Sequence, residues 1–314
     1  MKRVRQFFGS RCFWLGMGAL AIVVADCGEL LAQEPGTVVA ADKRVQGRSY
    51  VFQETGETIQ FAVFVPSNYD AAKKWPLMVG LHGRGRPYDW LMGYDGIVDF
   101  AQRDGFIMVT PLGYRSLGGF GAPRLTPMEA QNTFSTFLPR PAPATPPLVR
   151  TPAQVQALER QEREEQGLPA SIRELSERDV MHVLEIVRKE FNVDPNRIYL
   201  WGQSMGGGGT YHLAAKYPDI WAAIAAAAPA PAPNLDELER FKQIPVLVLQ
   251  GDADQTVPPA YTRDSVSKMK QLGMEYVYVE IKGGDHSLFL SKSPETLSKI
   301  FSFFNIAHKN QRMP

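Results

Sequence analysis

The stretch GQSMG, residues 202–206, decides the fold of this chain. It follows an apolar run at residues 197–201, which predicts a strand, and it precedes residues 209–216, which predict a helix. Glycine stands two positions before and two positions after Ser204, because a tight turn from strand to helix leaves little room for side chains. Ser204 would therefore sit at a helix N-terminus, where backbone N–H groups favour negative charge. Such a turn is also compatible with a purely structural role, so the rest of the chain must supply partners for the serine.

An imidazole is the expected partner, since a serine hydroxyl becomes a good nucleophile only when a base takes its proton. The chain contains five histidines: His82, His182, His212, His286 and His308. His182 and His212 fall inside predicted helices and His308 lies in the tail, which favours surface or packing roles. His286 stands in the glycine loop GGDHS, directly after a predicted strand. We therefore expect His286 to be the base.

An acid that orients the imidazole is expected between the serine and the histidine in chain order. The loop GDADQTVP, residues 251–258, follows another predicted strand and contains Asp252 and Asp254. Asp254 is the preferred acid, with Asp252 as the alternative, because aspartate in a turn commonly binds the turn itself. Asp285 is a poor candidate because neighbours along an extended loop point in different directions.

Charge that develops on a substrate carbonyl needs preorganised donors. The backbone N–H of Met205 is one expected donor. A second should come from the loop LHGRG, residues 81–85, with Arg84 preferred and Gly83 as the alternative. His82 in this loop is expected to brace it. Metal-hydrolase motifs such as H-E-x-x-H are absent from the sequence, and we expect neither a metal nor an organic cofactor.

Strands and helices alternate around these motifs, which predicts a doubly wound, mostly parallel sheet. The other predicted strands cover residues 75–81, 106–110, 244–250 and 275–281, and the other predicted helices cover residues 176–191, 261–272 and 294–307. Residues 49–53 and 58–66 predict an antiparallel hairpin that turns at residues 54–57. Residues 114–170 are rich in proline and then in charge, and we expect an insertion there, either a mobile surface loop or a lid.

The first 32 residues have the composition of a signal peptide. Lys2, Arg3, Arg5 and Arg11 precede an apolar run at residues 13–24. This run is shorter than the roughly 20 residues that span a bilayer, so an uncleaved anchor is the weaker interpretation. Cleavage is expected after Ala32, with Ala25 as the alternative, and the mature protein is expected to be secreted or periplasmic. An extension at residues 33–48 would precede the main domain, residues 49–308, and a short tail at residues 309–314 would follow it.

Composition is that of a soluble globular protein, with 44% hydrophobic and 21% charged residues. The formal net charge of +1 argues against nucleic acid or a charged membrane surface as partners. The two cysteines, Cys12 and Cys27, both lie in the expected leader, so a mature chain would have no disulfide. The sequence leaves the oligomeric state open.

Together the motifs around His82, Ser204, Asp254 and His286 resemble those of secreted esterases with the α/β-hydrolase fold. This group includes feruloyl and acetylxylan esterases and polyhydroxyalkanoate depolymerases, and prolyl-oligopeptidase-type catalytic domains are related to it. The resemblance covers residues 49–307 apart from the insertion. It implies that Ser204 is the nucleophile, Asp254 the orienting acid and His286 the base. Gln203 departs from the pattern, since many relatives carry histidine or alanine there.

The expected activity is hydrolysis of carboxylic esters through an acyl-enzyme, on a small-molecule or polysaccharide-linked ester. Arg86 and Trp90, close to the predicted oxyanion loop, are candidates for contact with a carboxylate or an aromatic acyl group. The alternatives are a prolyl-oligopeptidase-like peptidase, a polyester depolymerase and a non-catalytic binding module.

Overall fold

The computed structural model describes residues 41–123, 156, 160, 163–164 and 166–309. The predicted leader with both cysteines, the first half of the predicted extension (33–40), most of the predicted insertion and residues 310–314 lie outside the described residues. No helix in the described ranges is long and apolar enough to cross a bilayer.

Within the described residues, eight strands form one sheet in the order β1-β2-β4-β3-β5-β6-β7-β8. They are β1 (Gln46–Val51), β2 (Thr58–Phe64), β3 (Trp75–Leu81), β4 (Ile107–Pro111), β5 (Val193–Gln203), β6 (Ala223–Ala227), β7 (Val246–Gly251) and β8 (Tyr276–Ile281). The six strands β3 to β8 are parallel to one another, while β2 is antiparallel to β1 and β4. The predicted parallel sheet with antiparallel edge strands is therefore confirmed.

The predicted hairpin is confirmed, with β1 beginning three residues earlier than expected. β1 and β2 pair in register from Gln46 opposite Val63 to Val51 opposite Thr58. The turn closes where the N–H of Phe52 donates to the carbonyl oxygen of Glu57 at 2.8 Å. Gly56 in this turn has a φ of 72°, which glycine adopts without steric cost.

The sequence prediction lacks β6, which the structure places between β5 and β7. Its sequence is AIAAA, and all five residues are buried. Alanine is the best helix former and is depleted in strands, so this run carries no strand signal. Small side chains suit the position because the preceding helix, at residues 205–216, lies very close. A Cβ added to Gly207 of that helix would come within 2.7 Å of the backbone of Pro229, just beyond β6.

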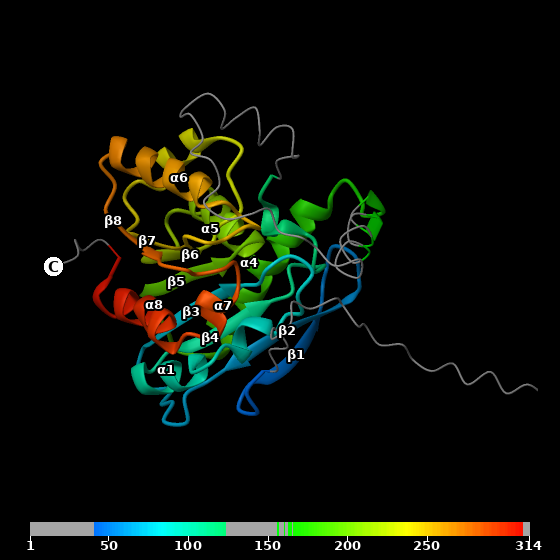
Figure 1. Cartoon of the computed structure of the whole chain (residues 1–314). Coiled ribbons are helices and arrows are strands. Elements are labelled where there is room, and N and C mark those ends of the chain that lie inside the picture. Colours follow the sequence, from blue (N-terminus) through cyan, green and yellow to red (C-terminus); the bar gives the residue numbers. More distant parts are fainter. Residues whose placement is uncertain (1–40, 124–155, 157–159, 161–162, 165, 310–314) are drawn as a thin grey trace, which may run out of the picture. The chain divides into compact units, whose positions relative to one another are not determined.

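Helices cover both faces of the sheet (Figure 1). They are α1 (Ile97–Asp104), α4 (Ile172–Glu190), α5 (Met205–Lys216), α6 (Pro259–Gln271), α7 (Leu288–Ser291) and α8 (Pro294–Ile306), with the short 3-10 helices η2 (Gly119–Gly121) and η3 (Leu235–Phe241). The predicted helices correspond to α4, α5, α6 and α8, whereas α1 and the one-turn α7 were not predicted.

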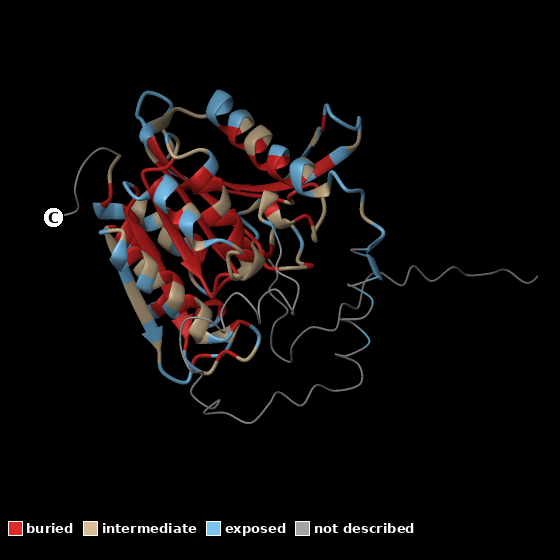
Figure 2. Ribbon diagram, turned by 90° about the horizontal axis from the view of Figure 1, so that it is seen from above, coloured by how far each residue is buried: buried red, intermediate tan, exposed pale blue. Residues whose placement is uncertain are grey.

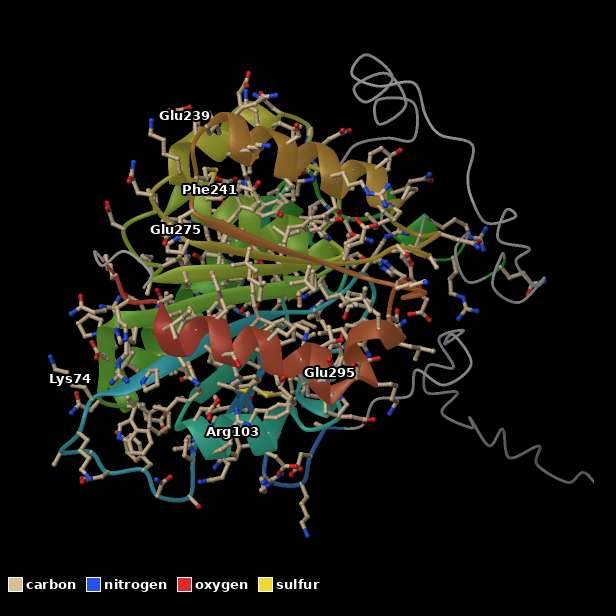
Figure 3. The ribbon with its side chains drawn as sticks, turned by 60° about the vertical axis from the view of Figure 1, so that its left-hand side comes forward. Lys74, Arg103, Glu239, Phe241, Glu275 and Glu295 are labelled. Carbon is tan, nitrogen blue, oxygen red and sulfur yellow. The ribbon has the colours of Figure 1, made fainter. Side chains whose placement is uncertain are left out.

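Two hydrophobic clusters lie on opposite sides of the sheet. One joins the strands to α4, α5 and α6, and the other joins them to α1 and α8. Figure 2 shows the central strands of the sheet as a buried layer, with exposed positions on the outer faces of the helices, whereas the edge strands β1 and β8 are half-buried or exposed. In Figure 3, Glu239 and Phe241 of η3 lie on the α6 side, while Arg103 of α1 and Glu295 of α8 lie on the opposite side.

The described start of the predicted insertion belongs to the body of the protein. Tyr114 and Phe120 are both buried, and Phe120 is completely inaccessible. Phe120 packs edge-to-face against His82 with 5.0 Å between ring centroids. It also covers α5 so closely that a Cβ on Gly209 would lie 2.8 Å from its own Cβ. The segment that interrupts the strand-helix rhythm therefore begins with residues that pack onto the body of the protein, and its described start ends at the exposed Pro123.

Candidate active site

Ser204 occupies the turn between β5 and α5 in a conformation that few side chains adopt. Its φ is 57° and its ψ is −118°. Such positive φ angles in non-glycine residues are strained and recur at functional sites. The N–H of Ser204 donates to the carbonyl oxygen of Ala227, and its own carbonyl oxygen accepts from the N–H of Ala230. Hydrogen bonds to the end of β6 thus stabilise the strained turn.

The glycines of this turn are required by close backbone contacts. A Cβ on Gly202 would lie 2.3 Å from the carbonyl oxygen of Gly206. A Cβ on Gly206 would lie 2.0 Å from the carbonyl oxygen of Leu81. Both distances are far below van der Waals contact, so no side chain fits at either position without a shift of the backbone.

The structure brings Ser204, His286 and Asp254 together, each at the end of a different strand. The hydroxyl of Ser204 donates to Nε2 of His286 across 2.9 Å. Nδ1 of His286 donates to Oδ2 of Asp254 across 2.8 Å. Because an ionised carboxylate only accepts hydrogen bonds, the proton of a neutral ring belongs on Nδ1, which leaves Nε2 as an acceptor. The arrangement can therefore remove the proton of the serine hydroxyl.

Asp254 is 3% exposed and is held by several donors besides His286. Its Oδ1 accepts from the N–H groups of Thr256 and Val257, both at 2.8 Å. Its Oδ2 also accepts from Nε2 of Gln250 at 3.0 Å. A carboxylate with this many donors stays fixed toward the imidazole and does not rotate.

The two other aspartates of these loops bind backbone. Oδ1 of Asp252 accepts from the N–H of Gly283 at 2.6 Å. Oδ1 of Asp285 accepts from the N–H groups at the start of α7, those of Ser287, Leu288 and Phe289. Of the three carboxylates considered from the sequence, Asp254 is the one bonded to the ring of His286.

His82 connects the loop after β3 to the loop after β4. Its Nδ1 lies 2.8 Å from the carbonyl oxygen of Gly83, and its Nε2 lies 2.8 Å from that of Leu112. Burial lowers the pKa of this fully enclosed imidazole. The remaining histidines have other partners or positions. His212 pairs with Glu177 at 2.8 Å, and His182 pairs with Glu54 at 3.3 Å. His308 follows α8.

The predicted oxyanion donors lie on two segments beside Ser204. Met205 is the first residue of α5, and the N–H groups of a first helical turn have no acceptor within the helix. The loop after β3 passes the serine closely, because a Cβ on Gly83 would lie 3.8 Å from the Cβ of Ser204. Arg84, Met205 and Ser204 line the same pocket.

This pocket has a volume of about 410 Å³. Its wall comes from five regions: Arg84 in the loop after β3, the turn at Ser204 with α5, lining residues within 117–123, lining residues within 169–173, and a proline-rich segment followed by η3. Most of the lining side chains are apolar or small: Leu117, Ala122, Pro123, Pro169, Ala170, Ile172, Tyr211, Ala230, Pro231, Ala232, Pro233, Leu238 and Phe241. The pocket thus offers an apolar surface that reaches the serine hydroxyl.

Arg86 and Trp90 do not line this pocket. Trp90 is 4% exposed and packs edge-to-face on Tyr94. The guanidinium of Arg86 lies over the ring of Trp90, 5.1 Å from its centroid. Their expected contact with substrate therefore has no support from the pocket geometry, because the indole ring is enclosed in the core.

Sequence reasoning missed two parts of the site. One is the wall at residues 230–241, which follows the unpredicted β6. The other is the side chain of Gln203, whose amide donates to the carbonyl oxygen of His286 at 2.7 Å. The GQSMG motif includes Gln203 but gives no indication of where its side chain points. Among the described residues, no three histidine, cysteine, aspartate or glutamate side chains are grouped as a metal site would require.

This sheet topology, with a serine at the sharp turn after β5 and an aspartate and a histidine after β7 and β8, defines a protein of the α/β-hydrolase fold. Residues 162–307 match the PETase family, described as PET hydrolase-like. That region contains Ser204, Asp254 and His286.

Curated relatives and solved structures agree with this classification. Cutinase 1 of Thermobifida cellulosilytica is 29% identical over 115 residues, which is 37% of this chain and 40% of the cutinase. The chain thus spans well under half the length of that relative. A thermostable esterase superposes with a TM-score of 0.56 at 24% identity, covering 85% of this chain and 64% of the esterase. A ferulic acid esterase from Anaeromyces mucronatus superposes with a TM-score of 0.54 at 16% identity, covering 84% of this chain and 90% of that protein. The predicted resemblance to esterases of the α/β-hydrolase superfamily is confirmed.

Proposed function

We propose that this protein is a serine carboxylic ester hydrolase in which Ser204, His286 and Asp254 form the catalytic triad. The observation that carries the proposal is the continuous hydrogen-bonded chain from Ser204 Oγ through the imidazole to Asp254, with distances of 2.9 and 2.8 Å, at the wall of an apolar pocket. Similarity to Cutinase 1 of Thermobifida cellulosilytica supports esters as the substrate class.

In the first step, Ser204 Oγ attacks the ester carbonyl carbon while Nε2 of His286 takes the hydroxyl proton. The tetrahedral intermediate collapses when the imidazolium gives this proton to the leaving alcohol, which breaks the bond between carbon and alcohol oxygen. A water molecule then attacks the acyl-enzyme while Nε2 of His286 takes its proton, and the imidazolium returns that proton to Ser204 Oγ as the bond between the acyl carbon and Oγ breaks and the acid is released. Asp254 keeps the ring oriented and stabilises the positive charge that the ring carries in between.

We assign the oxyanion hole to the backbone N–H groups of Met205 and Arg84. Both residues line the pocket with Ser204, and Met205 stands at the N-terminus of α5, where the helix dipole favours negative charge. One oxyanion donor typically contributes about 3 to 4 kcal/mol to transition-state stabilisation.

A polymeric ester is a second candidate substrate. It is favoured by the match of residues 162–307 to a family described as PET hydrolase-like and by the cutinase relatives. A soluble short-chain ester and a polymer would share the same acyl-transfer chemistry. They differ in whether the alcohol side of the substrate extends beyond the pocket.

We further propose that the protein is exported, on the basis of the basic and then apolar composition of residues 1–32. Mass spectrometry of protein recovered from the growth medium or periplasm would locate the new N-terminus. Recovery of the full-length chain in the cytoplasm alone would contradict export.

The test of the catalytic assignment is hydrolysis of p-nitrophenyl esters from acetate to decanoate by the wild-type chain and by Ser204→Ala. We expect the variant to lose at least about a thousandfold in kcat and to resist labelling by a fluorophosphonate. Ser267→Ala, on the exposed face of α6, is the matched control and should keep full activity. An active Ser204→Ala would refute the assignment, and faster cleavage of aminoacyl-p-nitroanilides than of esters would make the protein a peptidase. Release of acid from polyester film would distinguish the polymer from small esters.

A further inference from the structure

The side chain of Gln203 lies inside the protein, between Tyr94 and the loop that carries His286. Gln203 is 1% exposed, although it directly precedes Ser204. Its Nε2 donates to the carbonyl oxygen of His286 at 2.7 Å. Its Oε1 accepts from the hydroxyl of Tyr94, which is also buried. Both ends of the amide are therefore used, and neither faces the pocket.

We infer that Tyr94 and Gln203 are positioning residues that hold the backbone of His286 at the distance from Ser204 that proton transfer requires. This inference rests on the proposed esterase function and concerns the geometry of its base. It assigns to Gln203 a role distinct from forming the turn that exposes the serine.

The direction of each hydrogen bond is determined by chemistry. A peptide carbonyl can only accept, so the NH₂ group of Gln203 must face His286 and its oxygen must face Tyr94. Burial raises the pKa of Tyr94 well above its usual range, so the phenol keeps the proton that it donates. The amide cannot flip without leaving two buried polar atoms unpaired, which is costly.

The position of Gln203 connects two parts of the site that the sheet does not join directly. Ser204 follows β5 and His286 follows β8, and the strands β6 and β7 lie between them. The backbone of Gln203 continues into the nucleophile, while its side chain reaches the base 83 residues further along the chain. A single residue therefore fixes both partners of the 2.9 Å contact between Ser204 Oγ and His286 Nε2.

Tyr94 is itself anchored against the core and against α7. Its ring packs edge-to-face on Trp90, with 5.0 Å between centroids, and on Trp201. The N–H of the next residue, Asp95, donates to the carbonyl oxygen of Ser291 at 3.0 Å. Lys292 forms an ion pair with the Asp95 carboxylate at 3.0 Å. Tyr94 and Asp95 thus contact the His286 loop through Gln203 and contact α7 and Lys292, which follow that loop, directly.

The alternative is that Gln203 only fills space and happens to satisfy its amide. Methionine has a similar volume and shape but no hydrogen-bonding amide, so Gln203→Met separates the two explanations. Gln203→Glu complements it at a pH above the pKa of the introduced carboxyl group, because the ionised form accepts from Tyr94 but cannot donate to the carbonyl of His286. Tyr94→Phe removes one oxygen atom and leaves the ring packing unchanged.

The experiment measures kcat and KM of these variants with p-nitrophenyl butyrate across pH 5 to 9, together with thermal unfolding. Gln203→Met and Gln203→Glu should lower kcat about ten- to a hundredfold, as small misplacements of a catalytic group do, while KM changes less than twofold. Tyr94→Phe should show a smaller loss of the same kind.

Matched controls are Gln271→Met on the exposed end of α6 and Tyr199→Phe, which removes a buried hydroxyl bonded to the carbonyl oxygen of Ala307 at 2.7 Å. Tyr199→Phe should lower the unfolding temperature and keep kcat. Wild-type kcat, within twofold, in both Gln203→Met and Tyr94→Phe would overturn the inference. If Gln203→Met does not fold, Tyr94→Phe decides by the same criterion.

Hydrogen–deuterium exchange gives a readout that needs no substrate. In Gln203→Met and Tyr94→Phe the amides of residues 283–292 should exchange faster than in the wild type, and unchanged exchange there would also overturn the inference. A wild-type chain without esterase activity would refute the proposed function, and the exchange data would still decide whether Tyr94 and Gln203 hold this loop.

Discussion

Asp254 and His286 face each other across the ends of two neighbouring strands, with 2.8 Å between Oδ2 of the carboxylate and Nδ1 of the ring. The other carboxylate oxygen is occupied by two backbone N–H groups. The carboxylate therefore has its orientation set by its own loop before it meets the imidazole. The ring adopts the tautomer that this fixed acceptor demands.

Asp254→Asn should lower kcat about a thousand- to ten-thousandfold, because an amide facing Nδ1 favours the tautomer in which Nε2 carries the proton. Ester hydrolysis under saturating substrate measures this loss. Asp252→Asn is the matched control, since Asp252 binds the N–H of Gly283, and it should keep kcat within severalfold. A larger loss in Asp252→Asn than in Asp254→Asn would make Asp252 the orienting acid.

Gly206→Ala should prevent stable folding, because its Cβ would lie 2.0 Å from the carbonyl oxygen of Leu81 and neither backbone can retreat. Gly208→Ala, in the same helix, should fold, since its Cβ would meet Ala230 at 3.3 Å and alanine favours helix. Soluble yield and circular dichroism compare the two. Equal stability of both variants would contradict the close contact between the turn and β3.

Gly83→Ala should fold normally and lose activity selectively. Its Cβ would make ordinary contacts, 3.5 Å from Trp90 and 3.8 Å from Cβ of Ser204. The added methyl group should lower kcat/KM more for esters of bulky acids than for acetate, because it narrows the space beside the nucleophile. Gly167→Ala, at an exposed position, is the control. An identical loss for all esters would show that this loop does not border the substrate.

Glu177 should contribute to stability in a pH range that the structure defines. Burial alone would raise its pKa, but hydrogen bonds from His212, Lys216 and Tyr217 outweigh burial and lower the pKa to about 2. A depressed pKa in the folded state means that the stabilisation is complete above the ordinary value, near 4.5, and is lost as the pH falls toward 2.

The measurement is the free energy of unfolding of the wild type and of Glu177→Gln between pH 7 and pH 2. The difference should be a few kcal/mol at most at neutral pH and should shrink below pH 4.5. Glu185→Gln, on the exposed side of the same helix, should show no such dependence. A difference that stays constant with pH would mean that Glu177 is not held as a carboxylate by these donors.

The sequence predicts the strands best where apolar residues form compact runs, as in β3, β7 and β8. It fails for β6, because five residues dominated by alanine look like a helix until the neighbouring strands are known. It also fails for α1, which spans only eight residues between two glycines in the left-handed conformation. Tertiary context decides both elements.

The predicted positions of Ser204, Asp254 and His286 could be read from the sequence because each stands in a loop directly after a predicted strand. Parallel strands bring such loops to one edge of the sheet. The contacts of Gln203 and the pocket wall at residues 230–241 had no comparable signal. They depend on which side of a turn a side chain takes and on a strand that the sequence does not reveal.

β8 is hydrogen-bonded to β7 on one side, and in the described sheet its other side is an edge. The proposed base follows this edge strand, whereas the proposed nucleophile follows β5 in the middle of the sheet. Edge elements open locally at a lower free energy than the core does. On heating, ester hydrolysis should therefore be lost at a lower temperature than the circular dichroism signal of the folded chain. Engineering for heat tolerance would then gain more from the outer edge at β8 than from further packing around β5.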